Sequence, residues 1–293
     1  MNKEIENKIW VCGNRTANQF LSNPYYICYD PYTHKDLDNI NHLNKYWSEY
    51  VCQRYVYDNQ LKSNIITFCH DIRLVKYTKI DVDRIKGENA VQYYYTWDDC
   101  YTSEYDKLGN RTAKDEELPD IRFRNIYHEL VMKMGQPRFM YDDFIEYLHK
   151  QTIVPIESIA ETASSENVSF ITRECYSCTW DTFCEMQQFL LGYFDFVQVK
   201  YGLCYDKKRH DEFFLTTIVP HYRYQYEQAN GELNFSHLLY QSKSFFSTIF
   251  NSDMNYGLSC RNNVYRLFSY NIELLISLFI YSRNHFMNPD CVY

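Results

Sequence analysis

Residues 262–281, NNVYRLFSYNIELLISLFIY, decide the expected fold. Their apolar side chains recur at steps of three and four residues, the spacing of a helix that is buried on most sides. These side chains are Val264, Leu267, Phe268, Ile272, Leu275, Ile276, Phe279 and Ile280. The unbroken apolar part, 274–280 with only Ser277 inside it, is far shorter than the roughly 20 residues that a bilayer span needs. We therefore predict a core helix against which other helices pack.

The same three- and four-residue spacing predicts further helices on both sides of this stretch. They cover residues 33–57, 63–77, 121–134, 142–151, 179–194 and 236–250, with a short one after Pro155. The β-branched residues of 63–77 leave a strand open there as the alternative. A small hairpin or sheet is expected between 78 and 101, and Tyr222, Tyr224 and Tyr226 alternate with polar residues as in a half-buried strand. The predicted fold class is predominantly α-helical with a minor β component, and α+β is the alternative.

The two ends of the chain show a different pattern. Residues 1–32 contain Pro24 and Pro31 and have no helical period, which predicts an extended N-terminal arm. Residues 286–293 follow the core helix and are expected to form a C-terminal tail. Between them we expect one large globular core, so that 1–293 is a single domain. The polar connector at 161–168 is the place where a division into two lobes would fall.

Charge and composition narrow the classes of partner. The formal net charge is -8 and the pI is about 5.6, whereas nucleic-acid binding needs a clustered basic face, so we expect no nucleic-acid partner. The same acidic balance leads us to expect no membrane partner, and the first residues lack a basic segment followed by an apolar one, which predicts synthesis in the cytosol without a signal peptide. Gly and Pro supply only 15 of 293 residues, and Tyr supplies 30. Tyrosine joins a large apolar ring to a polar tip, which favours contact surfaces.

The sequence contains no recognised motif for phosphate loops, serine hydrolases, zinc proteases or calcium loops. Cys175, Cys178 and Cys184 could supply thiolates to zinc, but a second pair of closely spaced ligands is missing. We predict no metal and no other cofactor. The eleven cysteines are expected to be mostly buried, reduced thiols.

Arg122 and His128, separated by five residues on a predicted helix, resemble the Arg-x(4–6)-His signature of HEPN ribonucleases. This resemblance implies an acid–base role for the two side chains on a phosphodiester across a dimer. The similar segments that begin at Arg261 and Arg283 depart from the signature, because Arg266 and Asn288 occupy the positions at which the family has His. A HEPN-like ribonuclease is therefore one alternative function, and a non-enzymatic protein-interaction module is another.

In size, composition and use of Tyr and Cys the chain resembles the polyhedrins, the viral occlusion-body proteins, and most of all a helical polyhedrin of the nudivirus type. No motif carries this resemblance. It implies a structural, non-enzymatic protein that assembles with itself into a crystalline lattice, encloses virions and dissolves in alkali. The lattice would be held by hydrophobic contacts, salt bridges, exchanged segments and disulfides between chains.

The resemblance leads us to expect particular residues in the lattice. Candidates for an intermolecular disulfide are Cys12 and Cys28 in the arm and Cys291 in the tail. The candidate lattice contacts are aromatic residues of the arm, the tail and the alternating segment: Tyr25, Tyr26, Tyr222, Tyr224, Tyr226, Phe286 and Tyr293.

Overall fold

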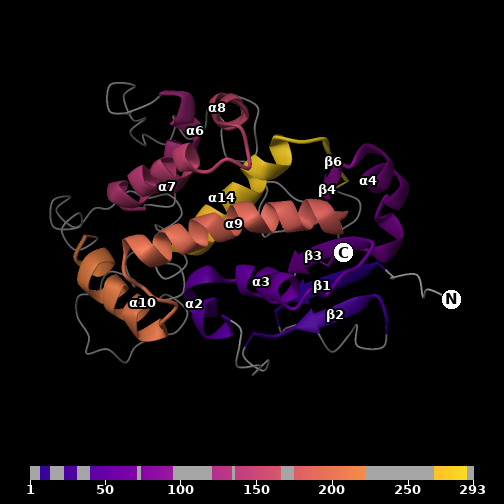
Figure 1. Cartoon of the computed structure of the whole chain (residues 1–293), viewed down its shortest axis with the longest axis horizontal. Helices are drawn as coiled ribbons and strands as arrows, with labels where there is room; N and C mark the ends of the chain where they lie inside the picture. The colour runs from indigo at the N-terminus through magenta and orange to yellow at the C-terminus, as the bar shows by residue number, and fades with distance from the viewer. Residues whose placement is uncertain are drawn as a thin grey trace.

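The structure, a computed structural model, describes residues 7–13, 23–31, 40–70, 74–94, 121–133, 136–165, 175–221 and 267–288. Its centre is a mixed sheet of six strands in the order β2-β1-β3-β5-β4-β6 (Figure 1). The strands are β1 Lys8–Cys12, β2 Tyr26–Tyr29, β3 Ile65–His70, β4 Val91–Tyr93, β5 Tyr176–Thr179 and β6 His285–Met287. β1 is parallel to β2 and β3, β4 is parallel to β6, and β5 is antiparallel to both of its neighbours. Five strands therefore run in one direction, and β5 runs against them.

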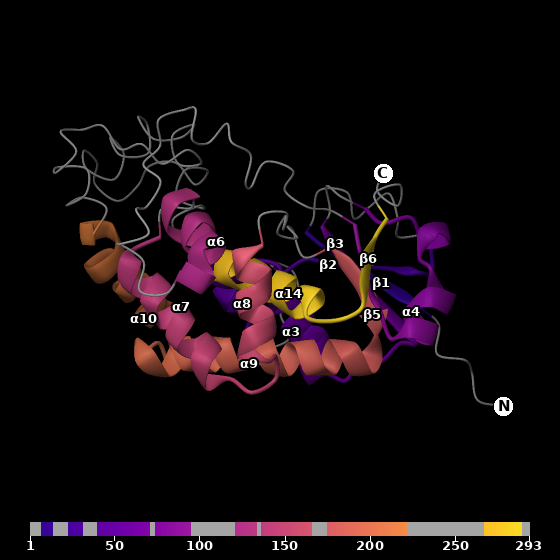
Figure 2. The same ribbon diagram turned by 90° about the horizontal axis from the view of Figure 1, so that it is seen from above.

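Helices lie over both faces of the sheet and in a group to one end of it. Their bounds are η1 Asn41–Leu43, α2 Asn44–Trp47, α3 Tyr50–Asp58, η2 Tyr77–Lys79, α4 Val82–Glu88, η4 Ile121–Phe123, α6 Arg124–Tyr127, the π-helix η5 His128–Lys133, α7 Arg138–Lys150, α8 Ile156–Ser164, α9 Trp180–Lys200, α10 Lys207–Phe213, the π-helix η6 Phe214–Ile218 and α14 Leu267–Tyr281. α3, α9 and α14 lie on one side of the sheet and α4 on the other (Figures 1 and 2). Among the described helices, none combines the length and apolar character that crossing a bilayer requires.

Side chains alternate between the two faces of the sheet, as the geometry of a strand requires. Trp10, Phe68 and Tyr176 belong to the buried cluster that includes α3, α9 and α14. Ile9 and Cys69, from the opposite face, belong to a smaller cluster with Ile85 of α4. Both faces of the sheet are therefore covered, which is the usual condition for parallel strands.

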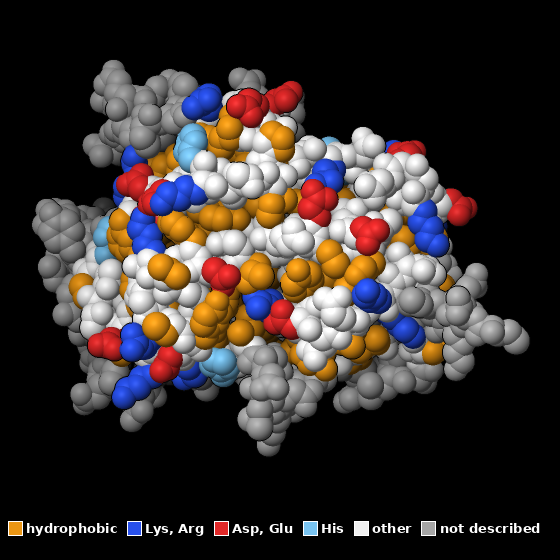
Figure 3. Space-filling model, in the orientation of Figure 1, with side chains coloured by type: hydrophobic (Ala, Val, Ile, Leu, Met, Phe, Trp, Pro, Cys, Tyr) orange, Lys and Arg blue, Asp and Glu red, His pale blue; other side chains and the backbone are white. Residues whose placement is uncertain are grey.

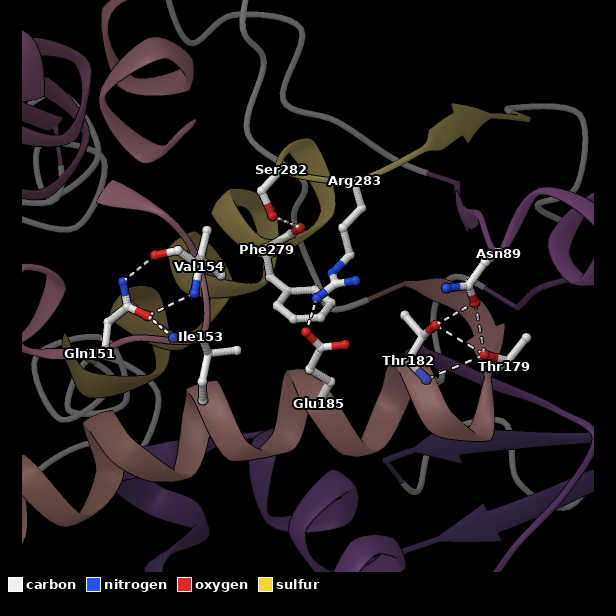
Figure 4. A network of polar contacts seen from close by, with 10 residues as sticks. All are labelled: Asn89, Gln151, Ile153, Val154, Thr179, Thr182, Glu185, Phe279, Ser282 and Arg283. Atoms are coloured by element: carbon white, nitrogen blue, oxygen red, sulfur yellow. Dashed lines mark hydrogen bonds and ion pairs between the residues drawn. The ribbon is translucent and has the colours of Figure 1, made fainter. Parts of the chain in front are cut away.

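The prediction of a core helix at the end of the chain is confirmed for α14. From Leu267 to Ile280 nearly every residue is buried, and the ring of Phe268 stacks on Trp47 of α2 with centroids 4.9 Å apart. α9 packs along α14, and Thr179 caps its start by accepting a hydrogen bond from the backbone N–H of Thr182 at 3.3 Å. The Oδ1 atom of Asn89 accepts hydrogen bonds from the hydroxyls of both threonines, which ties the end of α4 to the start of α9 (Figure 4).

The prediction of a predominantly helical fold is wrong, because a six-stranded sheet forms the centre of a mixed α/β fold. The predicted arm contains β1 and β2, and β1 lies inside the sheet with Trp10 opposite Ile27 and Phe68. One of its two pairing partners, β3, lies more than fifty residues away in the sequence, so local periodicity could not reveal this pairing. The predicted tail is wrong at its start for a similar reason, since Phe286 lies in β6 opposite Gln92 of β4, and residues 289–293 lie outside the described residues.

Other local predictions differ from the structure in more limited ways. Residues 65–70 of the predicted helix 63–77 form β3, the alternative that the β-branched residues had left open. The predicted helix 33–57 is interrupted at Ser48, whose φ of 49° separates α2 from α3. Between 78 and 101 the structure has α4 as well as the strand β4. The predicted strand at 222–226 and helix at 236–250 lie outside the described residues.

A single buried cluster includes Trp10 of β1, Phe144 of α7 and Ile280 of α14, so the sheet and the helices share one core. The helix α8 covers residues 161–164 of the expected lobe boundary, and residues 166–168 lie outside the described residues. A single domain over 1–293 stays a prediction.

Candidate functional site at the carboxyl edge of the sheet

The direction of the strands brings several strand ends to one edge of the sheet. Because five strands are co-directional, their last residues lie along the same edge: Cys12, Tyr29, His70, Tyr93 and Met287. Tyr176, the first residue of the reversed strand β5, lies at that edge as well. We call it the carboxyl edge.

The strand order creates a switch point at this edge. β2 lies on one side of β1 in the sheet, and the next strand in the chain, β3, lies on the other side of β1. In open α/β sheets, ligands bind outside the carboxyl ends of the strands where successive connections lead to opposite sides. Here that point lies between β1 and β3, whose end residues Cys12 and His70 are directly opposite each other.

Gly13 lets the chain turn at the end of β1. Its φ is 119°, a backbone conformation that only glycine adopts readily. Its backbone N–H donates to the carbonyl oxygen of Tyr29 at 3.1 Å, which holds the ends of β1 and β2 together. No side chain rises from the backbone here, so the backbone at the end of β1 can come close to a ligand.

An imidazole–carboxylate pair lies at the end of β3. His70 Nε2 is 2.9 Å from Oε1 of Glu49, the residue that precedes α3, and the two side chains are 20% and 14% exposed. The hydroxyl of Ser48 donates to the other oxygen of Glu49. Ser48 is buried, with φ 49° and ψ −131°, an unfavourable conformation for a residue with a Cβ atom. The edge thus has a group able to exchange protons, held by a carboxylate whose own orientation is fixed.

The other groups near this point are less suited to chemistry. Tyr29 is fully buried, its hydroxyl donates to Oδ1 of Asn41, and burial raises its pKa. Burial also raises the pKa of the Cys69 thiol well above its ordinary value and raises that of Cys28. These thiols therefore stay protonated near neutral pH and are poor nucleophiles.

The expected lattice residues lie in several parts of this fold. Cys12 is buried at the end of β1, and Cys28 is half-buried in β2. Tyr25 stacks on Tyr77 with ring centroids 3.6 Å apart, and the hydroxyl of Tyr26 donates to the carbonyl of Val75 at 2.9 Å. These two tyrosines make contacts within the chain. Cys12 would have to become exposed before it could form a disulfide with another chain. The intermolecular disulfides and the lattice contacts both stay predictions.

Phe286 also contacts its own chain, since the guanidinium of Arg84 lies 4.0 Å from the centre of its ring. The remaining candidates, Tyr222, Tyr224, Tyr226, Cys291 and Tyr293, lie outside the described residues.

The structure does not test the alternative Arg–His site. Arg122 is exposed in η4, and the side chain of His128 lies outside the described part of the structure. Within the described ranges, no three His, Cys, Asp or Glu side chains are grouped closely enough to hold a metal ion. On the face shown in Figure 3, lysine and arginine side chains stand beside aspartate and glutamate ones and form no continuous basic area.

Sequence reasoning missed Glu49 and His70. Each lay inside a predicted helix, and 21 positions separate them. The available signal was the run Ile65, Ile66, Thr67 and Phe68, which ends shortly before the polar pair His70 and Asp71 and is typical of a buried strand that ends at a site.

No protein-family model and no curated protein matches this chain. One solved structure that it resembles is described as the apo structure of the bifunctional glycosyltransferase WbbM. The sequence identity is 12%, the TM-score is 0.36, and the match covers 65% of this chain and 36% of that one. A TM-score of this size does not establish a common fold, so we infer nothing from it.

Proposed function

We propose that the protein is an α/β enzyme that binds a small hydroxyl-bearing molecule, a sugar or the sugar part of a nucleotide, at the carboxyl edge. The observation that carries this proposal is the switch point between β1 and β3. It is supported by Gly13, which lets a ligand approach the backbone, and by the pair of His70 and Glu49 at the same point.

The chemistry of the described side chains favours hydroxyl groups as the ligand feature. Asp30 follows β2 directly, and Glu49 and His70 lie at the end of β3. Carboxylates accept hydrogen bonds from hydroxyl groups, and an imidazole can donate or accept them. The carboxylates among the described residues attract an anionic phosphate less than a neutral sugar, so a nucleotide would place its ribose or sugar, and not its phosphates, against Asp30 and Glu49.

Titration calorimetry with four probes tests this proposal. Glucose, uridine, uridine diphosphate and uridine diphosphate glucose separate the contributions of a free sugar, a ribose and a diphosphate. We expect at least one hydroxyl-bearing probe to bind, and His70→Gln to weaken that binding about tenfold or more through loss of a hydrogen-bonding partner in the site.

The matched control is His285→Gln. His285 begins β6 at the opposite edge of the same sheet, and the substitution makes the same chemical change there. Equal effects of the two substitutions, or no binding of any probe, would contradict a ligand site at the carboxyl edge.

Self-assembly into an occlusion-body lattice is the second proposal, and the 30 tyrosines support it. β1 and β2 of the arm and β6 of the tail lie in the sheet of the same chain, so the described part of the protein offers its folded surface for contacts between chains. Large hydrophobic side chains are exposed there, at Val199 (83%), Tyr205, Leu215 and Met287 (each 43%). Sedimentation of the protein as particles from a cell lysate at neutral pH would support a lattice, and a protein that stays in the supernatant as a monomer would exclude it.

A further inference from the structure

Two cysteines lie on neighbouring strands at the carboxyl edge. β3 and β5 are antiparallel, and the last pair of their ladder at this edge is Phe68 opposite Tyr176. Cys69 follows Phe68 and Cys175 precedes Tyr176, so these two cysteines form the next cross-strand pair. Each is only 1% exposed, and both belong to the buried cluster on the α4 side of the sheet. Their thiols therefore share one face of the sheet.

A backbone hydrogen bond shows which kind of cross-strand pair this is. The carbonyl oxygen of Cys175 accepts from the backbone N–H of Tyr94, which follows β4, at 3.3 Å. Since the N–H and C=O groups of one strand residue point to the same side, those of Cys175 face β4 and not β3. Cys69 and Cys175 therefore form a non-hydrogen-bonded pair, in which Cα atoms are about 4.5 Å apart and the side chains are closest.

The nearest pair of the same kind shows that side chains meet on this face. Thr67 and Ser177 lie opposite each other, two residues along from the cysteines and on the same face, and their hydroxyl oxygens are 2.5 Å apart. Burial raises the pKa of Cys69 well above its ordinary value, and the nearby thiol of Cys175 raises it further. A disulfide needs Cα atoms roughly 4.4–6.8 Å apart, which a pair of this kind satisfies.

Other cysteines in the described strands are placed less well for Cys69. Cys28 is opposite Val11, and Val11 is opposite Cys69, so the whole of β1 separates the two cysteines. Two steps across a sheet amount to about 9.5 Å, beyond the limit of roughly 7 Å for a disulfide. Cys178 of β5 points to the other face, into the cluster with α9. The register thus places Cys175, and neither Cys28 nor Cys178, within reach of Cys69.

We propose that Cys69 and Cys175 form a reversible disulfide with a disulfide oxidant such as oxidised glutathione, and that this bond clamps β3 to β5 beside His70. One cysteine thiolate attacks the oxidant, forms a mixed disulfide and releases one glutathione. The second thiolate attacks the cysteine sulfur of the mixed disulfide and releases the other glutathione. Two protons and two electrons pass from the cysteines to the two glutathione molecules. The proposal does not depend on a ligand at the carboxyl edge.

Burial decides when this exchange takes place. The thiolate is the attacking species, and both thiols are shielded in the folded chain, so the reduced protein should react slowly. We expect the bond to form when the strands open locally and to hold the pair together afterwards. Because Cys69 and Cys175 are more than one hundred residues apart, the bond closes a large loop and restricts the unfolded chain.

Incubation of the folded, full-length protein with reduced and oxidised glutathione tests the proposal. The remaining thiols are alkylated with N-ethylmaleimide, and linked peptides are identified by mass spectrometry after digestion. We expect the main link to join Cys69 to Cys175, and to form faster in urea below the unfolding midpoint. Linkage of Cys69 mainly to another cysteine, or its recovery as the alkylated thiol even at that urea concentration, would overturn the proposal.

Cys178→Ser is the matched control, because Cys178 is as buried in the same strand but lies opposite Ile66. This variant should keep the link and a rise of the urea midpoint on oxidation of about 1 M, which a reductant reverses. Cys69→Ser and Cys175→Ser should each lose both. If a serine variant does not fold, the peptide map of the wild type still decides. An equal rise in folded Cys69→Ser would show that another bond stabilises the oxidised protein and would overturn the proposal.

Discussion

His210 is completely buried at the contact of α2, α9 and α10. Its Nδ1 atom lies 2.8 Å from the carbonyl oxygen of Asp206, and its Nε2 atom lies 3.3 Å from both Trp47 Nε1 and Gln198 Nε2. Two donors at Nε2 require that nitrogen to be the acceptor, so the folded protein holds the ring neutral. Burial accordingly lowers the pKa of His210.

This residue should make the fold sensitive to acid. Since the pKa is lower in the folded chain, the unfolded chain takes up the proton first, and stability falls as the pH drops below about 6.5, by up to about 1.4 kcal/mol per pH unit. We expect urea unfolding of the wild type to show this loss between neutral pH and pH ~5.5, and His210→Gln to be less stable at neutral pH but less sensitive to acid. Burial lowers the pKa of His221 as well, so part of the slope should remain. Identical slopes in the two proteins would exclude His210 as the cause.

At the scale of elements, the contact of α7 with α9 depends on a glycine. A Cβ atom at Gly192 would lie 2.9 Å from Oη and 3.3 Å from Cε2 of Tyr147. Tyr147 is buried, and its hydroxyl donates to the carbonyl of Phe189, so the ring has little room to move. We expect Gly192→Ala to destabilise the protein by about 1–3 kcal/mol although alanine is the better helix former.

Gly87 of α4 is the matched control, because nothing lies within 4 Å of a Cβ atom at that position. Gly87→Ala should stabilise the protein by about 0.5–1 kcal/mol, the ordinary gain in an exposed helix. Thermal unfolding of both variants measures the difference, and a gain in stability for Gly192→Ala would show that the helices can separate to admit a methyl group.

The strand β6 lies where the sequence predicts a C-terminal tail. A tail beyond the core helix could be deleted without loss, but β6 pairs with β4, Asn288 N donates to Tyr93 O at 3.1 Å, and Phe286 packs under Arg84. Removal of residues 284–293 should cost about 2–4 kcal/mol through the lost hydrogen bonds and ring contact. A truncation that removes only 289–293 leaves β6 intact and is the control. Equal denaturation midpoints for the two truncations would show that β6 contributes nothing.

For the whole molecule, the long helices, in which buried positions repeat over several turns, could be predicted from the sequence, and the sheet could not. α14, α9 and α7 each repeat their buried positions over several turns, so the sequence of the element contains its own signal. The strands are three to six residues long and pair with segments far away, as Trp10 does with Phe68. The site could not be predicted either, because Glu49 and His70 come together only through the order and direction of the strands in the folded sheet.

The many tyrosines give the whole molecule a predictable response to alkali. Several are buried in the core, and burial raises the pKa of Tyr50, Tyr147 and Tyr193. A phenol whose pKa is raised on folding stabilises the folded state below the unfolded pKa of about 10, and this contribution is lost as the pH rises above that value. We therefore expect the chain to unfold cooperatively above pH ~10.

If the protein forms a lattice, the same expectation predicts that alkali dissolves the lattice by unfolding its subunits and not by releasing them folded. If alkali only released folded subunits by ionising tyrosines at contacts, the dissolved protein would keep its near-ultraviolet circular dichroism. Since the buried tyrosines titrate only when the core opens, we expect phenolate absorbance and loss of circular dichroism to rise together. A pH titration that follows turbidity, absorbance and circular dichroism in one sample distinguishes the two cases. Complete phenolate formation with the circular dichroism intact would contradict the buried-tyrosine account.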